Sequence, residues 1–357
     1  MREIDGSYGE GGGQILRTSI ALSLIRGVPV TISRVRAGRR RPGLRPQHLA
    51  CVRAAAEISG AQVEGAEIGS QQVSIVPGPV RPGRYTFDVA EEQGSAGSVA
   101  LMLQTILPVL PLAGAPSELV LRGGTHVPMS PPAHYVRSVL CPVLALLGAR
   151  VEVEIRRCGY YPRGGGEIAV RISPSGGLKP LVLGERGALE RIVGLSGVTK
   201  LPLSIAERQR SEVLRRLEHL GTPVEIDAAE LPGRWPGTFV HLAAECERGL
   251  GGANALGRPG KRAEQVGDEA AGELLQFLSS SAPVDPHLAD QLVVFLALAS
   301  GASEVRTSRI TPHLLTNLWV CEQLLGMEYE VDGEEGREGG VRIAGVGSSR
   351  AEGSRGG

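Results

Sequence analysis

Hydrophobic and polar positions follow one another in a helix-and-strand unit that occurs three times along the chain. Each unit opens with an apolar helix, continues through a strand, a loop and a second helix, and closes with two strands. The first unit comprises expected helices at 13–25 and 46–59 and strands at 28–35, 62–68 and 72–76. The second comprises helices at 94–110 and 133–147 and strands at 117–121, 150–155 and 166–172. The third comprises helices at 287–298 and 313–325 and strands at 303–307, 329–331 and 341–344.

The spacing of one residue type indicates an insertion between the second and third units. Gln14, Gln104 and Gln291 lie in comparable first helices, at intervals of 90 and 187 residues. The second interval exceeds the first by 97 residues, which is enough for a small domain. The expected elements of this insertion are a helix at 205–220, strands at 224–227 and 238–244, and a Gly-rich interruption at 249–260.

The order of strands and helices predicts the fold class. Strand-to-helix connections within repeats are typical of α/β or α+β layers, in which helices cover one face of each sheet. We therefore expect an α/β protein with a large domain built from residues 1–182 and 277–344 and a smaller inserted α/β domain at 183–276. The tail at 345–357 is rich in Gly, Ser and Arg and is expected to be disordered.

Composition narrows the class of protein. The chain has 357 residues, of which 42% are hydrophobic, as in folded globular proteins. It has no apolar run long enough to cross a membrane, and its start lacks the basic-then-apolar order of a secretion signal, so we expect a cytoplasmic protein. The five cysteines form no CxxC pair, which predicts small buried side chains rather than a zinc site or a disulfide framework.

Two neighbouring segments near the N-terminus point to phosphate chemistry. A glycine-rich run at 5–14 leads directly into the first expected helix, where backbone N–H groups and the helix dipole favour an anion. The loop at 34–48 carries six arginines and no acidic residue, and guanidinium groups bind phosphate oxygens through paired hydrogen bonds. The net charge is zero and arginine is common throughout, but this local excess favours a phosphate or nucleic-acid ligand over a solvated loop.

Histidine is the candidate nucleophile, because the chain has no Walker P-loop, GxSxG or HExxH motif. An imidazole in the first turn of a helix can attack phosphorus at the positive end of the helix dipole. His313 fits that position, but it also fits a surface helix cap. Glu10, inside the glycine-rich run, is either a Mg²⁺ ligand or a simple first-turn acid. The run at 159–167 is either a hairpin turn or a ligand loop, and its three glycines before a strand favour the turn.

Several motifs occur together in a familiar order. They are Asp5-Gly6 with Gly9-Glu10-Gly11-Gly12-Gly13-Gln14 and Arg17, Arg36-Ala37-Gly38-Arg39, Pro42-Gly43-Leu44, Gln47-His48, Tyr161-Pro162-Arg163-Gly164-Gly165-Gly166, Asp290-Gln291-Leu292 and His313-Leu314-Leu315-Thr316-Asn317. This series resembles the RNA 3′-terminal phosphate cyclases over about residues 1–345, with the insertion in the expected place. Several independent motifs in one order make the resemblance specific.

The resemblance implies a fold and a reaction. The fold would be a large domain of three βαβαββ-type units, similar to those of the enolpyruvate transferases, with a small inserted α/β domain. The protein would be a ligase-type RNA-processing enzyme that uses ATP and a divalent metal, Mg²⁺ or Mn²⁺, on RNA with a 3′-phosphate end. His313 would attack the α-phosphorus of ATP to form a covalent histidine–AMP adduct, and AMP would pass to the RNA 3′-phosphate. The neighbouring 2′-OH would then close a 2′,3′-cyclic phosphate.

The resemblance also implies residue roles. His313 would be the nucleophile and Glu10 the metal ligand. The ATP- and phosphate-binding residues would be Arg17, Arg36, Arg39, Gln47, His48, Gln104, Pro131, His287, Asp290 and Gln291. His287 stands where the family usually has a tyrosine that packs on adenine, and His126 stands where Asp or Asn is commoner. The alternative function is a non-catalytic, RNA-binding ribosome-assembly factor of the same fold; such relatives lack the nucleophilic histidine, so His313 favours the enzyme.

Overall fold

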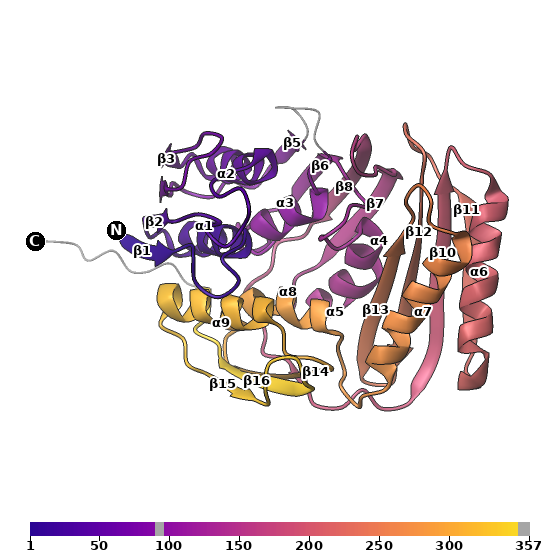
Figure 1. Ribbon diagram of the computed structural model, residues 1–357. Helices are drawn as coiled ribbons and strands as arrows, with labels where there is room; N and C mark the ends of the chain where they lie inside the picture. The colour runs from indigo at the N-terminus through magenta and orange to yellow at the C-terminus, as the bar shows by residue number, and fades with distance from the viewer. Residues whose placement is uncertain (90–95, 349–357) are drawn as a thin grey trace, which may run out of the picture.

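The computed structural model describes residues 1–89 and 96–348, and it arranges them as four four-stranded sheets with helices packed on them (Figure 1). The first sheet has the order β1-β2-β4-β3, and helices α1 and α2 belong to the same stretch of chain. Their bounds are β1 Arg2–Asp5, α1 Gln14–Arg26, β2 Val30–Ser33, α2 Pro46–Ser59, β3 Gln62–Glu64 and β4 Val73–Val76.

Two further sheets repeat this strand order. The second has the order β5-β6-β8-β7 and the third β9-β14-β16-β15. In each of the three, the first two strands are parallel and the remaining pairings are antiparallel. The second group consists of β5 Arg84–Asp88, α3 Val99–Ile106, a 3-10 turn Leu110–Leu112, β6 Ser117–Gly123, α4 Ala133–Tyr135, a π-helical stretch Val136–Leu140, α5 Cys141–Leu146, β7 Val151–Arg157 and β8 Gly166–Ile172. The third consists of β9 Val182–Leu183, α8 Pro286–Ala297, β14 Ala302–Thr307, α9 Pro312–Leu325, β15 Tyr329–Asp332 and β16 Gly339–Ala344.

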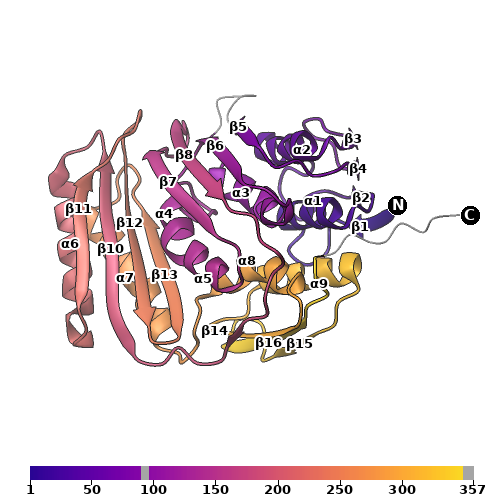
Figure 2. The ribbon, with the colours of Figure 1, turned by 180° about the vertical axis from the view of Figure 1, so that it is seen from behind.

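The fourth sheet has the order β11-β10-β12-β13, and helices α6 and α7 lie on one of its faces. The elements of this α6/α7 layer are β10 Leu189–Thr199, α6 Leu203–Leu217, a 3-10 turn Glu218–Leu220, β11 Val224–Glu230, β12 Gly237–Cys246, β13 Gly249–Leu256 and α7 Ala263–Leu278. Figure 2 shows the opposite face of the sheet, and α4 contacts this sheet through β12 and β13.

Within the described residues, three hydrophobic clusters hold these parts together, and two of them are large. One core is continuous through the three similar sheets and includes the buried faces of α1, α2, α3, α8 and α9. A smaller core lies between the fourth sheet and helices α6 and α7, with Ile192, Val240 and Phe277 among its members. The all-round burial of α1, from Ile15 to Ile25, places that helix at the centre of the larger core, next to α9.

Most expected helices are confirmed, and the differences are local. Helix α3 is shorter than expected: Ser98 caps its N-terminus by accepting a 3.2 Å hydrogen bond from the Leu101 N–H, and the helix ends at Ile106. Part of the expected start, at 94–95, lies outside the described residues. The hairpin expected at 159–167 is confirmed, since it joins β7 to its antiparallel neighbour β8. The prediction of buried, unpaired cysteines is also confirmed.

Two expectations were wrong. The Gly-rich stretch at 249–260 is not an interruption, because Gly249–Leu256 forms strand β13 beside β12. A Cβ at Gly251 would lie 2.4 Å from the Phe277 ring and one at Gly252 2.8 Å from the Tyr135 ring, so glycine is needed for two helices to pack on this strand. The tail is not disordered at its start, since the backbone N–H groups of residues 345–347 donate to carbonyls at Gly301, Ala297 and Ala299.

Candidate functional site

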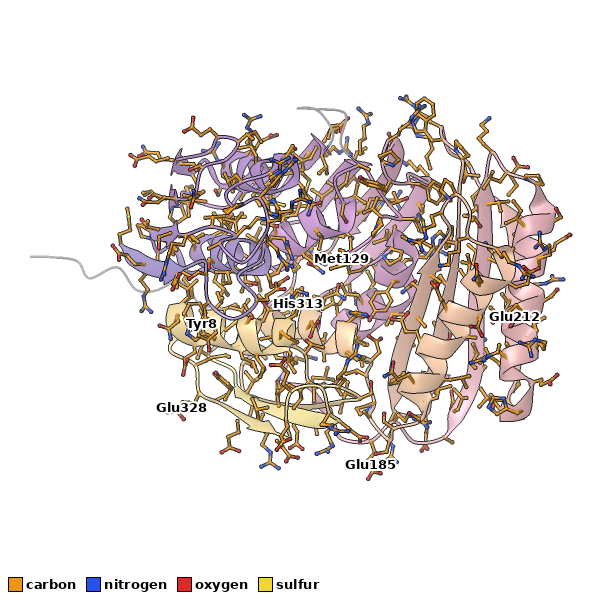
Figure 3. The ribbon with its side chains drawn as sticks, in the orientation of Figure 1. Tyr8, Met129, Glu185, Glu212, His313 and Glu328 are labelled. Carbon is orange, nitrogen blue, oxygen red and sulfur yellow. The ribbon has the colours of Figure 1, made fainter. Side chains whose placement is uncertain are left out.

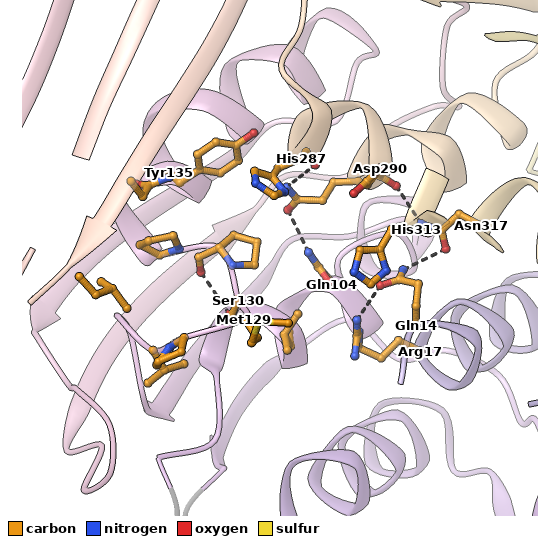
Figure 4. Close-up of a pocket in the computed structure, with 18 of the residues that line it drawn as sticks. Gln14, Arg17, Gln104, Met129, Ser130, Tyr135, His287, Asp290, His313 and Asn317 are labelled. Atoms are coloured by element: carbon orange, nitrogen blue, oxygen red, sulfur yellow. Dashed lines mark hydrogen bonds between the residues drawn. The ribbon is translucent and has the colours of Figure 1, made fainter. Parts of the chain in front are cut away.

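A pocket of about 440 Å³ lies where helices α1, α3, α8 and α9 approach the α6/α7 layer (Figure 4). One end is polar and is formed by Gln14, Arg17, Asp290, His313 and Asn317. The opposite end is formed by Tyr135, Asn254, Leu256, Glu273 and His287. The wall between them comes from the loop at 127–132, with Leu101, Gln104 and Gln291. In Figure 3, Met129 of this loop and His313 lie on the same side of the molecule.

His313 sits in the first turn of α9. Thr311 is the N-cap and accepts a 3.0 Å hydrogen bond from the Leu314 N–H. Pro312 occupies the first helical position, where a backbone N–H would have no partner within the helix. The imidazole Nδ1 lies 2.9 Å from Oε1 of Glu10, and the side chain is 42% exposed. The ring N–H does not point along that line, so the contact is electrostatic rather than an aligned hydrogen bond. Because the carboxylate lies beside Nδ1, Nε2 is the ring nitrogen on the side away from Glu10.

Glu10 is held as a carboxylate by its neighbours. Burial opposes its ionisation, but His313, Arg39 and Arg17 together outweigh that effect and lower the pKa of Glu10. Its Oε2 accepts a 2.8 Å hydrogen bond from Arg39 Nη2, and its Oε1 is buried without an aligned donor. The glycine-rich run makes this approach possible: a Cβ at Gly12 would lie 2.6 Å from Oε1 of Glu10.

A concentrated positive field lies behind His313 and Glu10. Arg17 is only 7% exposed; its Nη2 donates a 2.6 Å hydrogen bond to Gln14 Oε1, and its Nε has no partner. His48 packs against Gly13, where a Cβ would lie 2.4 Å from the ring. Burial, followed by the charges of four arginines, lowers the pKa of His48 to about 3, so it is neutral near pH 7. A buried guanidinium nitrogen without an acceptor, in such a field, is a place for an anion.

A polar network fixes the polar end across three helices. Asn317 Oδ1 accepts hydrogen bonds from Gln14 Nε2 at 2.9 Å and from Thr18 Oγ1 at 2.8 Å, and its Nδ2 donates to the Asp290 carbonyl at 2.8 Å. Thr311 donates to the Asp290 carboxylate. Burial raises the pKa of Asp290 to about 6, against the opposing effects of Thr311, His313 and His287. The network ties α1, α8 and α9 into one rigid wall.

The opposite end joins α8 to the α6/α7 layer. His287 Nε2 lies 3.4 Å from Glu273 Oε1, and that contact raises the pKa of His287 to about 9, so the ring is cationic at neutral pH. Half of the His287 side chain is exposed, so solvent screens the pair. Glu273 Oε2 also accepts a 2.9 Å hydrogen bond from the Asn254 N–H. The charged ring therefore lies where helix α7 and strand β13 reach the pocket.

The structure brings most of the expected site residues together. The seven that line the pocket are Arg17, Gln104, Pro131, His287, Asp290, Gln291 and His313. Glu10 contacts His313 just outside it, and Arg39 contacts Glu10. Arg36, Gln47 and His48 do not line the pocket: Arg36 donates to the Arg41 and Gly43 carbonyls of its own loop, and Gln47 Oε1 accepts from the Ser98 N–H at 3.0 Å. Gln104 donates to Gln291 at 3.0 Å and leaves its own Oε1 without a partner.

Sequence reasoning missed the contribution of the α6/α7 layer. Asn254, Leu256 and Glu273 line the pocket, although the sequence places them in a segment expected to form a separate domain. Tyr135 was missed as well; its hydroxyl donates to the buried Asp285 carboxylate at 2.8 and 2.9 Å. No local pattern marks these residues, because their role depends on contacts with distant segments.

Within residues 1–89 and 96–348, no three His, Cys, Asp or Glu side chains gather as a metal site. A cation at this pocket would therefore depend on Glu10 together with ligands from elsewhere. Over the same described part of the chain, no helix has the length and apolar character needed to span a bilayer.

The family model and the curated relatives point to one family. The family model described as RNA 3′-terminal phosphate cyclase matches residues 8–331. A protein of that name from Thermococcus onnurineus is 47% identical over 346 residues, covering 97% of this chain and 99% of the relative. Another of that name, from Methylococcus capsulatus, is 46% identical over 351 residues, covering 97% of each chain. The enolpyruvyl transferase NikO from Streptomyces tendae aligns with a TM-score of 0.42 at 10% identity, over 98% of this chain and 50% of that one.

Proposed function

The chain belongs to the RNA 3′-terminal phosphate cyclase family, and we propose that it converts the 3′-phosphate end of an RNA into a 2′,3′-cyclic phosphate at the expense of ATP. The observation that carries this proposal is the position of His313. Its imidazole stands at the positive end of a helix, with Nδ1 beside the Glu10 carboxylate and the pocket in front of it. A free imidazole at that point is suited to attack a phosphorus.

The first step is adenylation of the protein. Nε2 of His313 attacks the α-phosphorus of ATP, an N–P bond forms, and the bond to pyrophosphate breaks with its electron pair leaving on pyrophosphate. Arg17 and Arg39 balance the negative charge of the phosphates, and the unpartnered Nε of Arg17 gains an acceptor. The Glu10 carboxylate stabilises the positive charge that develops on the imidazole.

The second and third steps transfer and release AMP. A 3′-phosphate oxygen of the RNA attacks the same phosphorus, and the N–P bond breaks so that its electron pair returns to the imidazole of His313. The neighbouring 2′-OH then attacks the activated 3′-phosphorus, loses its proton, and AMP leaves. The protein contributes position and charge, since the activated phosphate already carries a good leaving group.

The far end of the pocket fits the nucleoside. Pro131 and Leu256 supply apolar surface, and the Gln104 Oε1 that lacks a hydrogen-bond partner is available to a polar group. His287 would pack on the base in its cationic form, as a charged ring with a smaller stacking face than tyrosine. Asp290 and Gln291 hold this wall in place through Thr311 and Gln104.

A divalent metal, Mg²⁺ or Mn²⁺, fits the carboxylate of Glu10. Its Oε1 is buried without an aligned hydrogen-bond donor, which suits a single-carboxylate site completed by substrate phosphates and water. When bound, the metal would neutralise phosphate charge. Glu10 would hold it next to His313, while Arg39 donates a hydrogen bond to the other oxygen of the carboxylate.

We also propose that the three sheets of similar strand order are three related βαβαββ units, at 1–182 and 277–344, and that 183–276 is an insertion between them. The shared order and pairing of the sheets support this. The separate hydrophobic core of the α6/α7 layer supports it too.

Labelling with ATP tests the proposed reaction directly. The protein is incubated with ATP labelled at the α-phosphate, with Mg²⁺ or Mn²⁺, and resolved by denaturing electrophoresis. We expect a protein-bound label that is acid-labile and alkali-stable, is absent in His313→Ala, and is chased by RNA with a 3′-phosphate. His219→Ala removes an exposed histidine at the end of α6 and should keep the label, which controls for the mutation itself. A folded wild-type protein that stays unlabelled with either metal would refute the reaction.

A further inference from the structure

Three loops meet where the second sheet touches the α6/α7 layer. They are the end of β7 with the β7–β8 connection, at 156–165, the end of β10 with the residues after it, at 199–202, and the β11–β12 connection, at 231–236. The Cys158 N–H donates to the Pro232 carbonyl at 2.7 Å, and the Tyr160 hydroxyl lies 3.1 Å from the Thr199 hydroxyl. We call the outer side of these three loops the basic aromatic surface.

Aromatic rings are exposed on this surface. Tyr161 is 71% exposed and makes no ring contact with another aromatic of the described residues. Trp235 is 38% exposed, and the Arg163 guanidinium lies over its ring, 4.2 Å from the centroid. A Cβ at Gly165 would come within 3.2 Å of the indole, so glycine allows the two loops to meet this closely. Exposed rings with an arginine stacked beside them can accept further planar groups.

The same surface is strongly cationic. Its three segments contain five basic residues and no acidic one: Arg156, Arg157, Arg163, Lys200 and Arg234. The neighbouring Glu167 pairs with Arg157 at 2.8 Å and with Arg156 at 3.6 Å. In the described part of the chain, no carboxylate pairs with Arg163, Lys200 or Arg234, so three positive charges are left for an outside partner. This contrasts with a net charge of zero for the whole protein.

Short connections link this surface to the pocket. The Ala96 N–H donates to the Pro162 carbonyl, and two residues later Ser98 bonds to Ser130, which lines the pocket. Two residues of chain span at most about 7 Å. A strand with its 3′ end in the pocket therefore needs to extend by only a few nucleotides to reach Tyr161.

We propose that the basic aromatic surface binds the single-stranded RNA upstream of the reactive 3′-phosphate, with bases stacked on Tyr161 and phosphates paired with Arg163, Lys200 and Arg234. This inference rests on the proposed function, because it identifies the polymer end as the occupant of the pocket. An acidic protein segment would use the cations but not the open ring face. Stacked rings beside unpaired arginines are the chemistry of single-strand binding without sequence preference.

Binding without ATP tests this surface separately from catalysis. Fluorescence anisotropy measures the affinity of the full chain for a 3′-phosphorylated single strand of roughly 20 nucleotides and for a 3′-phosphorylated dinucleotide. Tyr161→Ala should weaken binding of the longer RNA by about 5- to 100-fold, while Tyr161→Phe retains it. Arg163→Ala should reduce the slope of log K against log salt by about 0.7. All variants should bind the dinucleotide as the wild type does.

The matched control is Arg171→Ala. Arg171 lies on strand β8, near the end of the strand that is away from the β7–β8 connection. Its side chain is 72% exposed. The Arg171→Ala variant should bind the longer RNA with the same affinity as the wild type. Unchanged RNA affinity in Tyr161→Ala and Arg163→Ala would overturn the proposal and favour a protein partner. An equal loss for both RNA lengths would overturn it too, because the residues would then act at the 3′ end itself.

The ATP-labelling experiment keeps the two proposals distinct. If the wild type is labelled by ATP but Tyr161→Ala binds long RNA normally, only the surface assignment fails. If the wild type is not labelled, the proposed reaction fails, and a selective loss of long-RNA binding in Tyr161→Ala still supports the surface. Tyr161→Ala should retain ATP labelling, since no Tyr161 atom lines the pocket.

Discussion

Replacing His126 with asparagine should make the stability of the protein less sensitive to acid. His126 belongs to a cluster of buried histidines between the second sheet and the α6/α7 layer, and it is 1% exposed. Its Nδ1 lies 2.8 Å from Thr125 Oγ1, and its Nε2 lies 2.8 Å from His134 Nδ1. The ring also stacks on Phe239, with centroids 4.0 Å apart. Among the described residues, the contacts of the His126 ring include no carboxylate that could pair with an extra proton.

The magnitude follows from the difference between folded and unfolded states. Burial, with a smaller contribution from His241, lowers the pKa of His126 from 6.5 to about 3. The unfolded chain therefore binds this proton first as the pH falls below 6.5, and folded stability is lost from there down to pH 3. Each pH unit in that window costs about 1.4 kcal/mol, so acidification from about pH 7 to pH 5 costs roughly 2 kcal/mol for this residue alone.

Urea unfolding of the wild type and His126→Asn at several pH values measures this cost. Asparagine keeps a polar group for Thr125 but does not titrate. Because it loses the ring contacts with His134 and Phe239, the variant is less stable than the wild type near neutral pH. The gap between the two unfolding free energies should then shrink by roughly 2 kcal/mol between about pH 7 and pH 5. Titrating groups that do not interact with His126 cancel in this difference, whereas His134 and His241 are electrostatically coupled to it. Parallel stability curves across that range would show that His126 is protonated in the folded protein and would refute the reasoning.

Two further predictions concern the pocket. Arg39→Ala removes the hydrogen bond to Glu10 and a nearby positive charge, and it should raise the Kd for ATP by about 10- to 100-fold in isothermal titration, with Arg171→Ala unchanged. Glu273→Gln removes the carboxylate that holds a proton on His287, so the pKa of His287 should fall from about 9 toward its ordinary 6.5 in an NMR titration. An unmoved His287 resonance would mean that Glu273 is not the cause of the shift.

The helices were predictable because their signals are local. The start of α9 is marked by Thr311 and Pro312, an N-cap and a first-turn proline, and its end by Gly326 with a φ of 66°. The position of His313 in the first turn follows from these residues. The same holds for α2, which begins at Pro46 and ends at Ser59, with Gly60 as its C-cap. Capping depends on a few neighbouring residues, so sequence alone places it.

Strand β13 was not predictable, because its glycines are required by the packing of residues that are distant in the sequence. Gly251 and Gly252 look like breakers in isolation. In the fold they are required by Phe277 and Tyr135, one ring on each side of the strand. A glycine that makes room for a neighbour has the same sequence signature as a glycine that ends an element. Only the packing separates the two, and so the strand and the pocket wall that it supplies were missed together.

The α6/α7 layer supplies part of the wall of the pocket, through Asn254, Leu256 and Glu273. Asp285, at the N-cap of α8, accepts hydrogen bonds from Tyr135 of α4 and from the Gly252 N–H of β13, at 2.8 Å in the latter case. The first turn of α8 carries His287, whose partner Glu273 comes from α7. A nucleotide that touches His287 and Asn254 as well as His313 binds only while these parts stay together. By thermodynamic linkage, binding of such a nucleotide stabilises the contact between the α6/α7 layer and the rest of the molecule. We therefore expect residues that carry no chemistry, such as Asp285 and Gly252, to affect how strongly the proposed nucleotide site holds ATP.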